Sequence, residues 1–298
     1  MSPADRAALA NLHKMALLPL LIRKYTELSM GRIFYDWTSA ESVRCSALQF
    51  PTVYRLMREA CETLDVPEPE LYIKYDFRYN ASTAGVNMPY ITLNSALVNS
   101  FSDDELLYII GREIGHIKCG QVMYQELGRM LIPLLDAIGE VTLGMGKLAG
   151  KGLVAGFFEW LRQAEYSCDR AGMLACQSTQ TAFTATMKLG CGSTRYNNEM
   201  NVDAFLAQAR AHSDQAGLEG LTKALVFHLY TWNMDHPQVV YRAKKLDEWI
   251  SSGAYHRIIA GEYQHETRSG GQPMRCKSCG SALASSAKFC MDCGNQVD

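Results

Sequence analysis

Two closely spaced cysteine pairs near the C-terminal end constrain the fold of this chain more than any other feature. Residues 274–298 contain two CxxCG sequences, separated by residues 281–289. Each CxxCG forms a tight knuckle that presents two thiolates to one tetrahedral ion. Because a segment this short has almost no core, metal binding has to supply its folding free energy. We therefore predict a zinc ribbon, with the ligands Cys276, Cys279, Cys290 and Cys293.

The remaining cysteines are scattered, and they indicate a reducing compartment. The apolar run 16–22 lacks a small-residue cleavage site and is followed by Arg23 and Lys24, so no signal peptide is convincing. The thiols are therefore expected to be reduced in a cytoplasmic protein. No apolar stretch reaches the roughly 20 residues that span a bilayer, so peripheral membrane contact is not favoured.

The balance of acidic and basic side chains indicates which class of partner the chain binds. The chain of 298 residues carries 29 basic and 31 acidic side chains, a net charge of −2. This disfavours a nucleic-acid binder with a strongly basic surface and favours a protein or peptide partner. The oligomeric state is not determined by the sequence.

Hydrophobic periodicity predicts a mainly α, α+β domain over residues 1–266, a linker over 267–273 and the ribbon over 274–298. Ser102 and Glu105 form a capping box that opens a helix reaching to about residue 124. Strands are expected at 71–75, 84–86 and 90–93. Further helices are expected at 3–30, 51–64, 125–148, 151–177, 202–211, 217–232 and 237–250.

The helix opened by Ser102 contains Arg112, Glu113 and His116, which read RExxH. With histidine at position 112 this would be HExxH, in which two histidines on one helical face bind zinc and the glutamate acts as general base. Farther along the chain, Glu165 and Asp169 lie four residues apart and share a helical face. One carboxylate in that arrangement can ligate a metal while the other orients a ligand.

A third element, Asp235-His236-Pro237 followed by Arg242, completes a pattern in this order: ExxH, ExxxDR and HPxxxxR. The pattern resembles the zinc metallopeptidase family of the CAAX prenyl, HtpX and Oma-type proteases over about residues 45–250. The resemblance implies a gluzincin fold, and it implies that residues 80–98 include the strand along the substrate cleft.

The resemblance also implies roles for single residues. Glu113 matches the general base, His116 the second zinc ligand and Glu165 the third. Asp169 matches the acid that supports the ligands. His236 matches the histidine near the metal, and Arg242 matches the arginine that follows it.

Arg112 departs from this pattern, because arginine stays protonated and offers no lone pair to a metal. In one interpretation its guanidinium replaces the metal and pairs with Glu165, Glu113 or Asp169. In a second, Arg112 turns away and His236 or Cys119 completes the metal sphere of an active endopeptidase. In a third, the site is metal-free and structural, with Arg112 solvated. We favour an impaired or inactive family member that binds peptide or protein in the family cleft.

Overall fold

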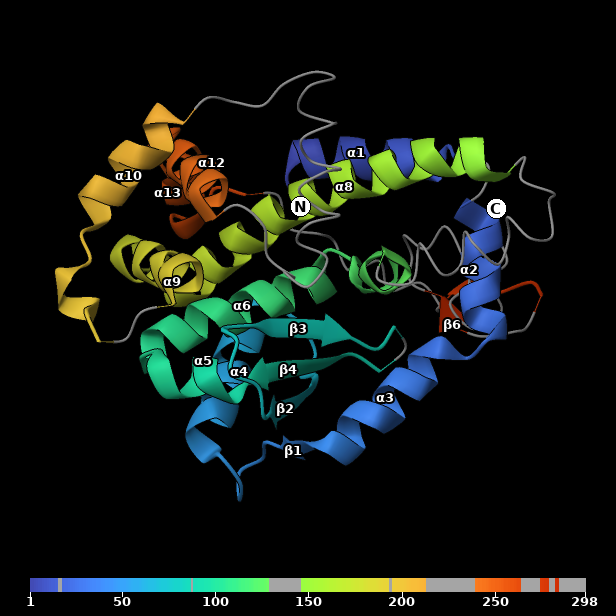
Figure 1. The fold of residues 1–298 in the computed structure, drawn as a ribbon, viewed down its shortest axis with the longest axis horizontal. Helices are drawn as coiled ribbons and strands as arrows, with labels where there is room; N and C mark the ends of the chain where they lie inside the picture. The colour runs from blue at the N-terminus through green and yellow to red at the C-terminus, as the bar shows by residue number, and fades with distance from the viewer. Residues whose placement is uncertain are drawn as a thin grey trace.

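A computed structural model describes residues 1–15, 18–86, 88–128, 146–192, 195–212, 239–263, 274–278 and 282–283. A small mixed sheet is stacked beneath helix α6 (Asp103–Lys118), and the long helix α8 (Gly146–Cys176) crosses above α6 (Figure 1). The predicted α+β class with mostly helical content therefore agrees with the structure. Among the described residues, no helix combines the length and apolar character that crossing a membrane requires.

The sheet has the strand order β1-β2-β4-β3. Strand β2 (Glu70–Lys74) runs parallel to β4 (Tyr90–Asn94), while β1 (Ser42–Arg44) and β3 (Ala81–Ala84) pair antiparallel at the two edges. In β3, Ala81 lies opposite Leu93 and Ala84 opposite Tyr90. This places β3 before the predicted position at 84–86, and β1 was not predicted.

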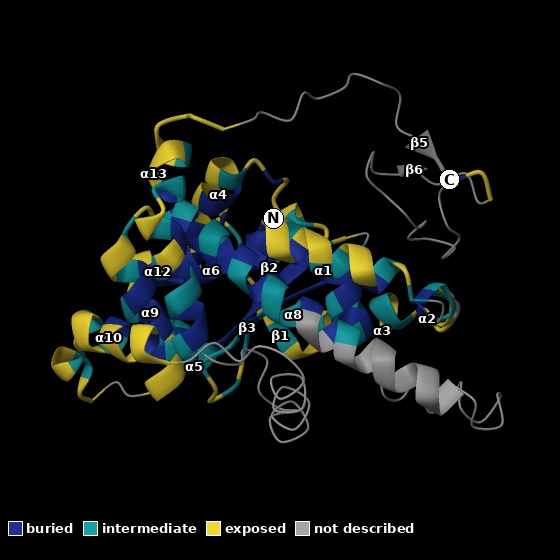
Figure 2. Cartoon of the chain, turned by 90° about the horizontal axis from the view of Figure 1, so that it is seen from above, coloured by how far each residue is buried: buried dark blue, intermediate teal, exposed yellow. Residues whose placement is uncertain are grey.

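One face of the sheet packs on α6 and α4 (Pro51–Leu64) and forms the main core. The alternation of β2 explains this, because Leu71 and Ile73 join that core while Tyr72 joins Tyr90 in a smaller cluster on which Tyr35 packs. Figure 2 shows the buried positions gathered along α6 and the strands. Helix α6 is thus covered from both sides, so polar side chains on it are forced into the interior.

The N-terminal segment differs from the single helix predicted over 3–30. It forms α1 (Pro3–His13), α2 (Leu18–Glu27) and α3 (Met30–Glu41). Proline lacks a backbone N–H and clashes with the carbonyl four residues earlier, so Pro19 is compatible with the start of α2 and not with a continuous helix. Helix α1 lies alongside α8 (Figure 1). Its Leu12 packs in a second core cluster with Phe157 and Trp160.

Other boundaries were predicted with mixed success. The capping box of Ser102 and Glu105 is confirmed, but α6 ends at Lys118 because Gly120 adopts a positive φ of 64° before the next helical turn. Helix α10 (Val202–Ala211) has the predicted bounds, and α12 (Val239–Ser251) covers the described part of the helix predicted over 237–250. The predicted helix 217–232 lies outside the described residues. Among the described residues, four α-helices were not predicted: α3, α5 (Ser95–Ser100), α9 (Thr179–Cys191) and α13 (Ala254–Ile259).

The C-terminal module is described only in part. Strands β5 (Met274–Arg275) and β6 (Ala282–Leu283) pair antiparallel, and Cys276 follows β5 directly. Of the four predicted zinc ligands, Cys279, Cys290 and Cys293 lie outside the described residues, as does the predicted linker 267–273.

Candidate active site

Small residues let α6 and α8 approach closely at the site. A Cβ atom added to Gly111 would lie 2.5 Å from the Cβ of Ala175, and one added to Gly115 would lie 2.7 Å from the Cβ of Ala171. On α8, a Cβ at Gly172 would lie 2.6 Å from the carbonyl oxygen of Tyr108. Because the backbones are this close, polar side chains that flank these glycines meet between the helices.

Arg112 of α6 extends into this contact and is fully buried, with 0% exposure. Its Nη2 atom donates to Glu165 Oε2 at 2.6 Å, and its Nε atom donates to Asp169 Oδ1 at 2.9 Å. Its Nη1 atom lies 4.0 Å from Glu113 Oε1. The guanidinium therefore faces all three carboxylates, and it is neither solvated nor turned away.

Arg242 of α12 binds the far side of Asp169. Its Nε atom donates to Oδ2 at 2.9 Å and its Nη2 atom donates to Oδ1 at 2.6 Å, a bidentate pair that fixes the carboxylate. The hydroxyl of Tyr108 donates to the same Oδ1 atom at 3.0 Å. We call Arg112, Glu165, Asp169 and Arg242 the arginine cluster.

In the arginine cluster, neighbouring opposite charges offset the effect of burial on the pKa of Asp169 and of Arg112. Burial alone would raise the pKa of Asp169, but Arg242 and Arg112 outweigh burial and lower it. Burial and the nearby Arg242 would lower the pKa of Arg112, yet the surrounding carboxylates raise it. Asp169, Arg112 and Arg242 are therefore charged in the folded protein, although they are buried.

Glu113 points from α6 toward the sheet. The hydroxyl of Thr83 on edge strand β3 donates to Glu113 Oε2 at 2.9 Å and also lies 3.1 Å from the Glu113 carbonyl oxygen. Its other carboxylate oxygen, Oε1, is buried and accepts no hydrogen bond from the described residues. In the arginine cluster, Nη1 of Arg242 is likewise buried without a hydrogen-bond partner among the described residues.

His116 lies one turn beyond Arg112 and is also buried. Its Nε2 atom is 3.5 Å from Glu165 Oε1, while its Nδ1 atom is 2.8 Å from Gln121 Oε1 and 3.1 Å from Cys168 Sγ. Burial would lower the pKa of His116, but the hydrogen bond and charge of Glu165 outweigh burial and raise it. Gln121 in turn donates a hydrogen bond to Asp5. We call His116, Gln121, Cys168 and Asp5 the histidine cluster.

The structure thus brings together Arg112, Glu113, His116, Glu165, Asp169 and Arg242 from three helices. Asp169 contacts the side chain at position 112 and not His116. Cys119 caps the C-terminal end of α6, and the thiol that contacts His116 is that of Cys168. His236 lies outside the described residues.

The family model for Peptidase family M48 matches residues 47–250, which is more than half of the chain. The chain belongs to peptidase family M48. This M48 chain is also 31% identical over 221 residues to the plastoglobule-localized metallopeptidase 48 of Arabidopsis thaliana chloroplasts. The match covers 73% of this chain and 62% of the relative, so the chain spans less than two thirds of that relative's length. No solved structure matches this chain significantly.

M48 proteins are zinc-dependent metallopeptidases, so the donor set of this M48 domain can be tested against zinc. A zinc site needs lone pairs from three protein side chains, and Arg112 supplies none. One oxygen of Glu165, Oε2, accepts from the Arg112 guanidinium at 2.6 Å, while the other, Oε1, lies 3.5 Å from His116 Nε2. Within the part of the chain that is described, no group of three or more His, Cys, Asp or Glu side chains is placed to hold a metal ion. The described residues do not fit zinc in the peptidase site.

Sequence reasoning missed several residues of the M48 site. Gln121 and Asp5 hold His116, Thr83 holds Glu113, and Tyr108 holds Asp169. Tyr108 lies four residues before Arg112 on the same helix, so helical spacing could have found it. Asp5 and Thr83 come from distant segments, and no local pattern marks them.

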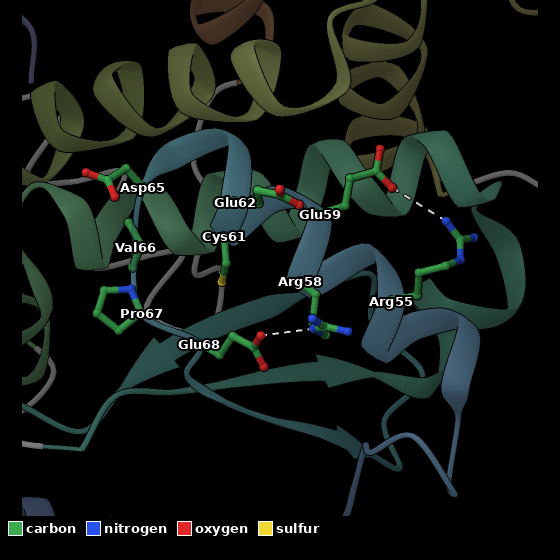
Figure 3. Close-up of a pocket in the computed structure, with 9 residues that line it drawn as sticks. All are labelled: Arg55, Arg58, Glu59, Cys61, Glu62, Asp65, Val66, Pro67 and Glu68. Carbon is green, nitrogen blue, oxygen red and sulfur yellow. Dashed lines mark hydrogen bonds and ion pairs between the residues drawn. The ribbon is translucent and has the colours of Figure 1, made fainter.

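Two cavities lie away from the arginine cluster. A groove of about 850 Å³ follows the C-terminal half of α4, and its arginines are bonded to acidic neighbours, Arg58 to Glu68 and Arg55 to Glu59 (Figure 3). A cavity of about 500 Å³ lies where α2 and α3 meet the end of β3, and its lining includes Gly85, Met88 and Met123.

Proposed function

We propose that this M48 domain is a pseudopeptidase, which binds a peptide or protein without hydrolysing it. The supporting observation is the position of Arg112, whose guanidinium is buried against Glu165 and Asp169. In HExxH peptidases the cation between these helices is zinc, which activates water and polarises the peptide carbonyl. A guanidinium supplies positive charge and hydrogen bonds but no coordination site for water. In this proposal Arg112 preserves the fold of the site without its chemistry.

The remaining residues have roles in this proposal that need no metal. The arginine cluster ties α6, α8 and α12 together, as a shared metal ligand set would. Glu113 is held by Thr83 and keeps one oxygen without a hydrogen bond from the described residues. We propose that this oxygen accepts a donor from a bound peptide.

Peptide binding in the family cleft is supported by the place of β3. This strand lies at the edge of the sheet, and Thr83 connects it directly to Glu113. Edge strands pair with extended peptides through backbone hydrogen bonds. The cavity at the end of β3 supplies space for side chains beside that edge.

The decisive experiment compares the wild-type chain with Arg112→His. We expect the wild type to show no peptide-library turnover that Glu113→Gln abolishes. Arg112→His restores HExxH with Glu165 and is expected to bind about one more zinc ion per chain. The matched control is Arg58→His, since Arg58 is an exposed arginine that pairs with Glu68.

Two results would contradict the proposal. Glu113-dependent turnover by the wild type would show an active endopeptidase, with His236 or Cys119 completing the metal sphere. Zinc retained at the peptidase site of the wild type would overturn the replacement of metal by Arg112. This zinc must be measured after the tail cysteines have been changed to serine, so that the ribbon does not contribute.

We propose separately that Cys276, Cys279, Cys290 and Cys293 bind one structural zinc. The spacing of the two pairs supports this, as does the β5–β6 pairing around the first pair. Changing Cys276 and Cys290 to serine should remove about one zinc ion per chain. Cys191→Ser is the control, because Cys191 is exposed and outside this module. Unchanged zinc content in the double variant would reject the ribbon.

We further propose a cytoplasmic location. Among the described residues, no disulfide joins Cys45, Cys61, Cys119, Cys168, Cys176 or Cys191, as a reducing compartment favours. The plastoglobule named for the Arabidopsis relative is a property of that protein. Cell fractionation of the tagged chain, with recovery in the membrane pellet counting against the proposal, tests this.

A further inference from the structure

A residue from outside the family-matching segment reaches the site. Asp5 lies in the first turn of α1, whereas the M48 match begins at residue 47. Its side chain is fully buried, and its Oδ2 atom accepts from Gln121 Nε2 at 2.6 Å and from Ser167 Oγ at 2.6 Å. The backbone N–H of Ser2 donates to Ser167 Oγ at 2.9 Å, so two positions of the N-terminal segment are fixed there.

The chemistry of these groups fixes the orientation of the Gln121 amide. An ionised carboxylate only accepts hydrogen bonds, so the Gln121 atom that faces Asp5 must be the NH₂ group. Its carbonyl oxygen Oε1 therefore faces His116 Nδ1, at 2.8 Å. A carbonyl oxygen only accepts, and hence the Nδ1 atom of His116 must carry the proton.

Of the other neighbours of His116, the Cys168 thiol is compatible with this tautomer, whereas the Gln125 NH₂ group can donate only to Nε2 once Nδ1 is protonated. Gln125 Nε2 lies 3.2 Å from His116 Nε2, where it can donate to the ring lone pair, and 3.0 Å from Nδ1. The thiol of Cys168 is 3.1 Å from Nδ1 and donates to Gln121 Oε1 at 3.3 Å. The Nε2 atom faces Glu165 at 3.5 Å. With one proton or two on the ring, Nδ1 is protonated.

We propose that Asp5 is a positioning residue that acts through Gln121 to keep a proton on His116 Nδ1 and to direct Nε2 toward Glu165. In this proposal helix α1 contributes Asp5 to the site in addition to packing against α8. Neutral histidine in water exchanges between its two tautomers, so without Asp5 the Gln121 amide can rotate and the preference is lost. The inference holds whether or not the site hydrolyses peptides.

The test determines which ring nitrogen of His116 carries the proton in the full chain. Long-range ¹H–¹⁵N spectra of ¹⁵N-histidine-labelled protein distinguish a protonated ring nitrogen from one with a lone pair, and His116→Gln assigns the signals. The wild type should show a protonated Nδ1. Asp5→Asn should retain this, because an asparagine oxygen still accepts from Gln121, whereas Asp5→Ala should give a mixture with Nε2-protonated histidine.

Two further variants keep the test decisive. Ser167→Ala removes the other donor to Asp5 Oδ2 and should leave the His116 tautomer unchanged. Gln121→Leu should lose the preference even if Asp5→Ala does not fold. A lone pair on Nδ1 in the wild type, or the wild-type signal in Gln121→Leu or in folded Asp5→Ala, would overturn the inference. A merely structural role of Asp5 would alter stability but not the ring nitrogens.

Discussion

The two clusters around the active-site helix satisfy buried polar groups in different ways. In the arginine cluster, charges compensate one another, with Asp169 bound by two guanidinium groups. In the histidine cluster, a neutral glutamine connects His116 to Asp5, and one oxygen of Asp5 accepts no hydrogen bond from the described residues. Both clusters are buried against the same helix α8.

This difference predicts how each cluster responds to the loss of one of its side chains. Deleting one member of a buried charge network strands an opposite charge, which is costly. Deleting an uncharged member of the histidine cluster, such as Gln121, costs less, but it changes which atom donates and which accepts. We therefore expect stability to report on the arginine cluster and the histidine tautomer to report on the other.

The largest expected effect is that of Arg112→Met. It leaves Glu165 without its 2.6 Å partner and should lower the free energy of unfolding by about 3–5 kcal/mol. Urea unfolding measures this, and Arg112→Lys should be intermediate because it keeps the charge without the fork. Arg58→Met, at an exposed pair with Glu68, is the control and should leave the midpoint unchanged. A fully stable Arg112→Met would show that the guanidinium is not the needed countercharge.

Overpacking at the helix contact should have the next largest effect. The Cβ of Gly111→Ala would meet Ala175 at 2.5 Å, so the free energy of unfolding should fall by about 1–3 kcal/mol. Gly128→Ala is the matched control, because its Cβ would lie 3.7 Å from Leu161, an ordinary contact. The control should be neutral or slightly stabilising. Equal stability of the two variants would argue against close backbone contact at Gly111.

Thr83→Val removes the hydroxyl that donates to Glu113 while keeping the shape of the side chain. A hydrogen bond to a buried carboxylate is lost, so we expect destabilisation of about 1.5 kcal/mol. Thermal or urea unfolding measures it. Thr26→Val, which loses only a bond to the Ile22 carbonyl of its own helix, should cost less. If Thr26→Val destabilised the protein more than Thr83→Val, the hydrogen bond from β3 to Glu113 would not stabilise the site as expected.

Asp5→Asn should have the smallest effect, with a distinctive pH dependence. Burial raises the pKa of Asp5 from 3.8, so the folded state holds this proton to higher pH than the unfolded state. The free energy of unfolding of the wild type therefore loses this contribution as the pH rises above about 4, and asparagine does not titrate. The variant should therefore gain stability relative to the wild type as the pH rises.

Urea unfolding at several pH values checks the Asp5 prediction. The exposed Asp203→Asn provides a control and should show no comparable gain. A variant that becomes less stable than the wild type as the pH rises would mean that the ionised Asp5 is favoured by its surroundings.

The parts of the fold that sequence predicted well carry strong local signals. Pro51 opens α4, and the Ser102–Glu105 capping box opens α6, as expected. The continuous helix predicted over 3–30 was wrong, since Pro19 outweighs the apolar periodicity. Strand β3 was placed too late because the register of an edge strand is set by its partner β4 and not by its own residues.

The candidate site shows the same division. The motif spacing placed Arg112, Glu165, Asp169 and Arg242 in one site, and the structure brings their charged groups within hydrogen-bond distance. The spacing did not indicate Gln121 or Asp5, because Asp5 is joined to the site across 116 residues of sequence. Their hydrogen bond depends on α1 lying against α8, which no local pattern encodes.

The sequence by itself determined that a cation with no lone pair stands where a metal ligand is expected, since the identity of Arg112 requires it. It also determined which carboxylates were available to pair with it. Only the tertiary structure decided that Arg112 is buried between them, because the close approach of α6 and α8 leaves the guanidinium no path to water. Tertiary structure likewise assigned Asp5 to His116, since hydrogen-bond direction is fixed by neighbours in space and not by neighbours in the chain.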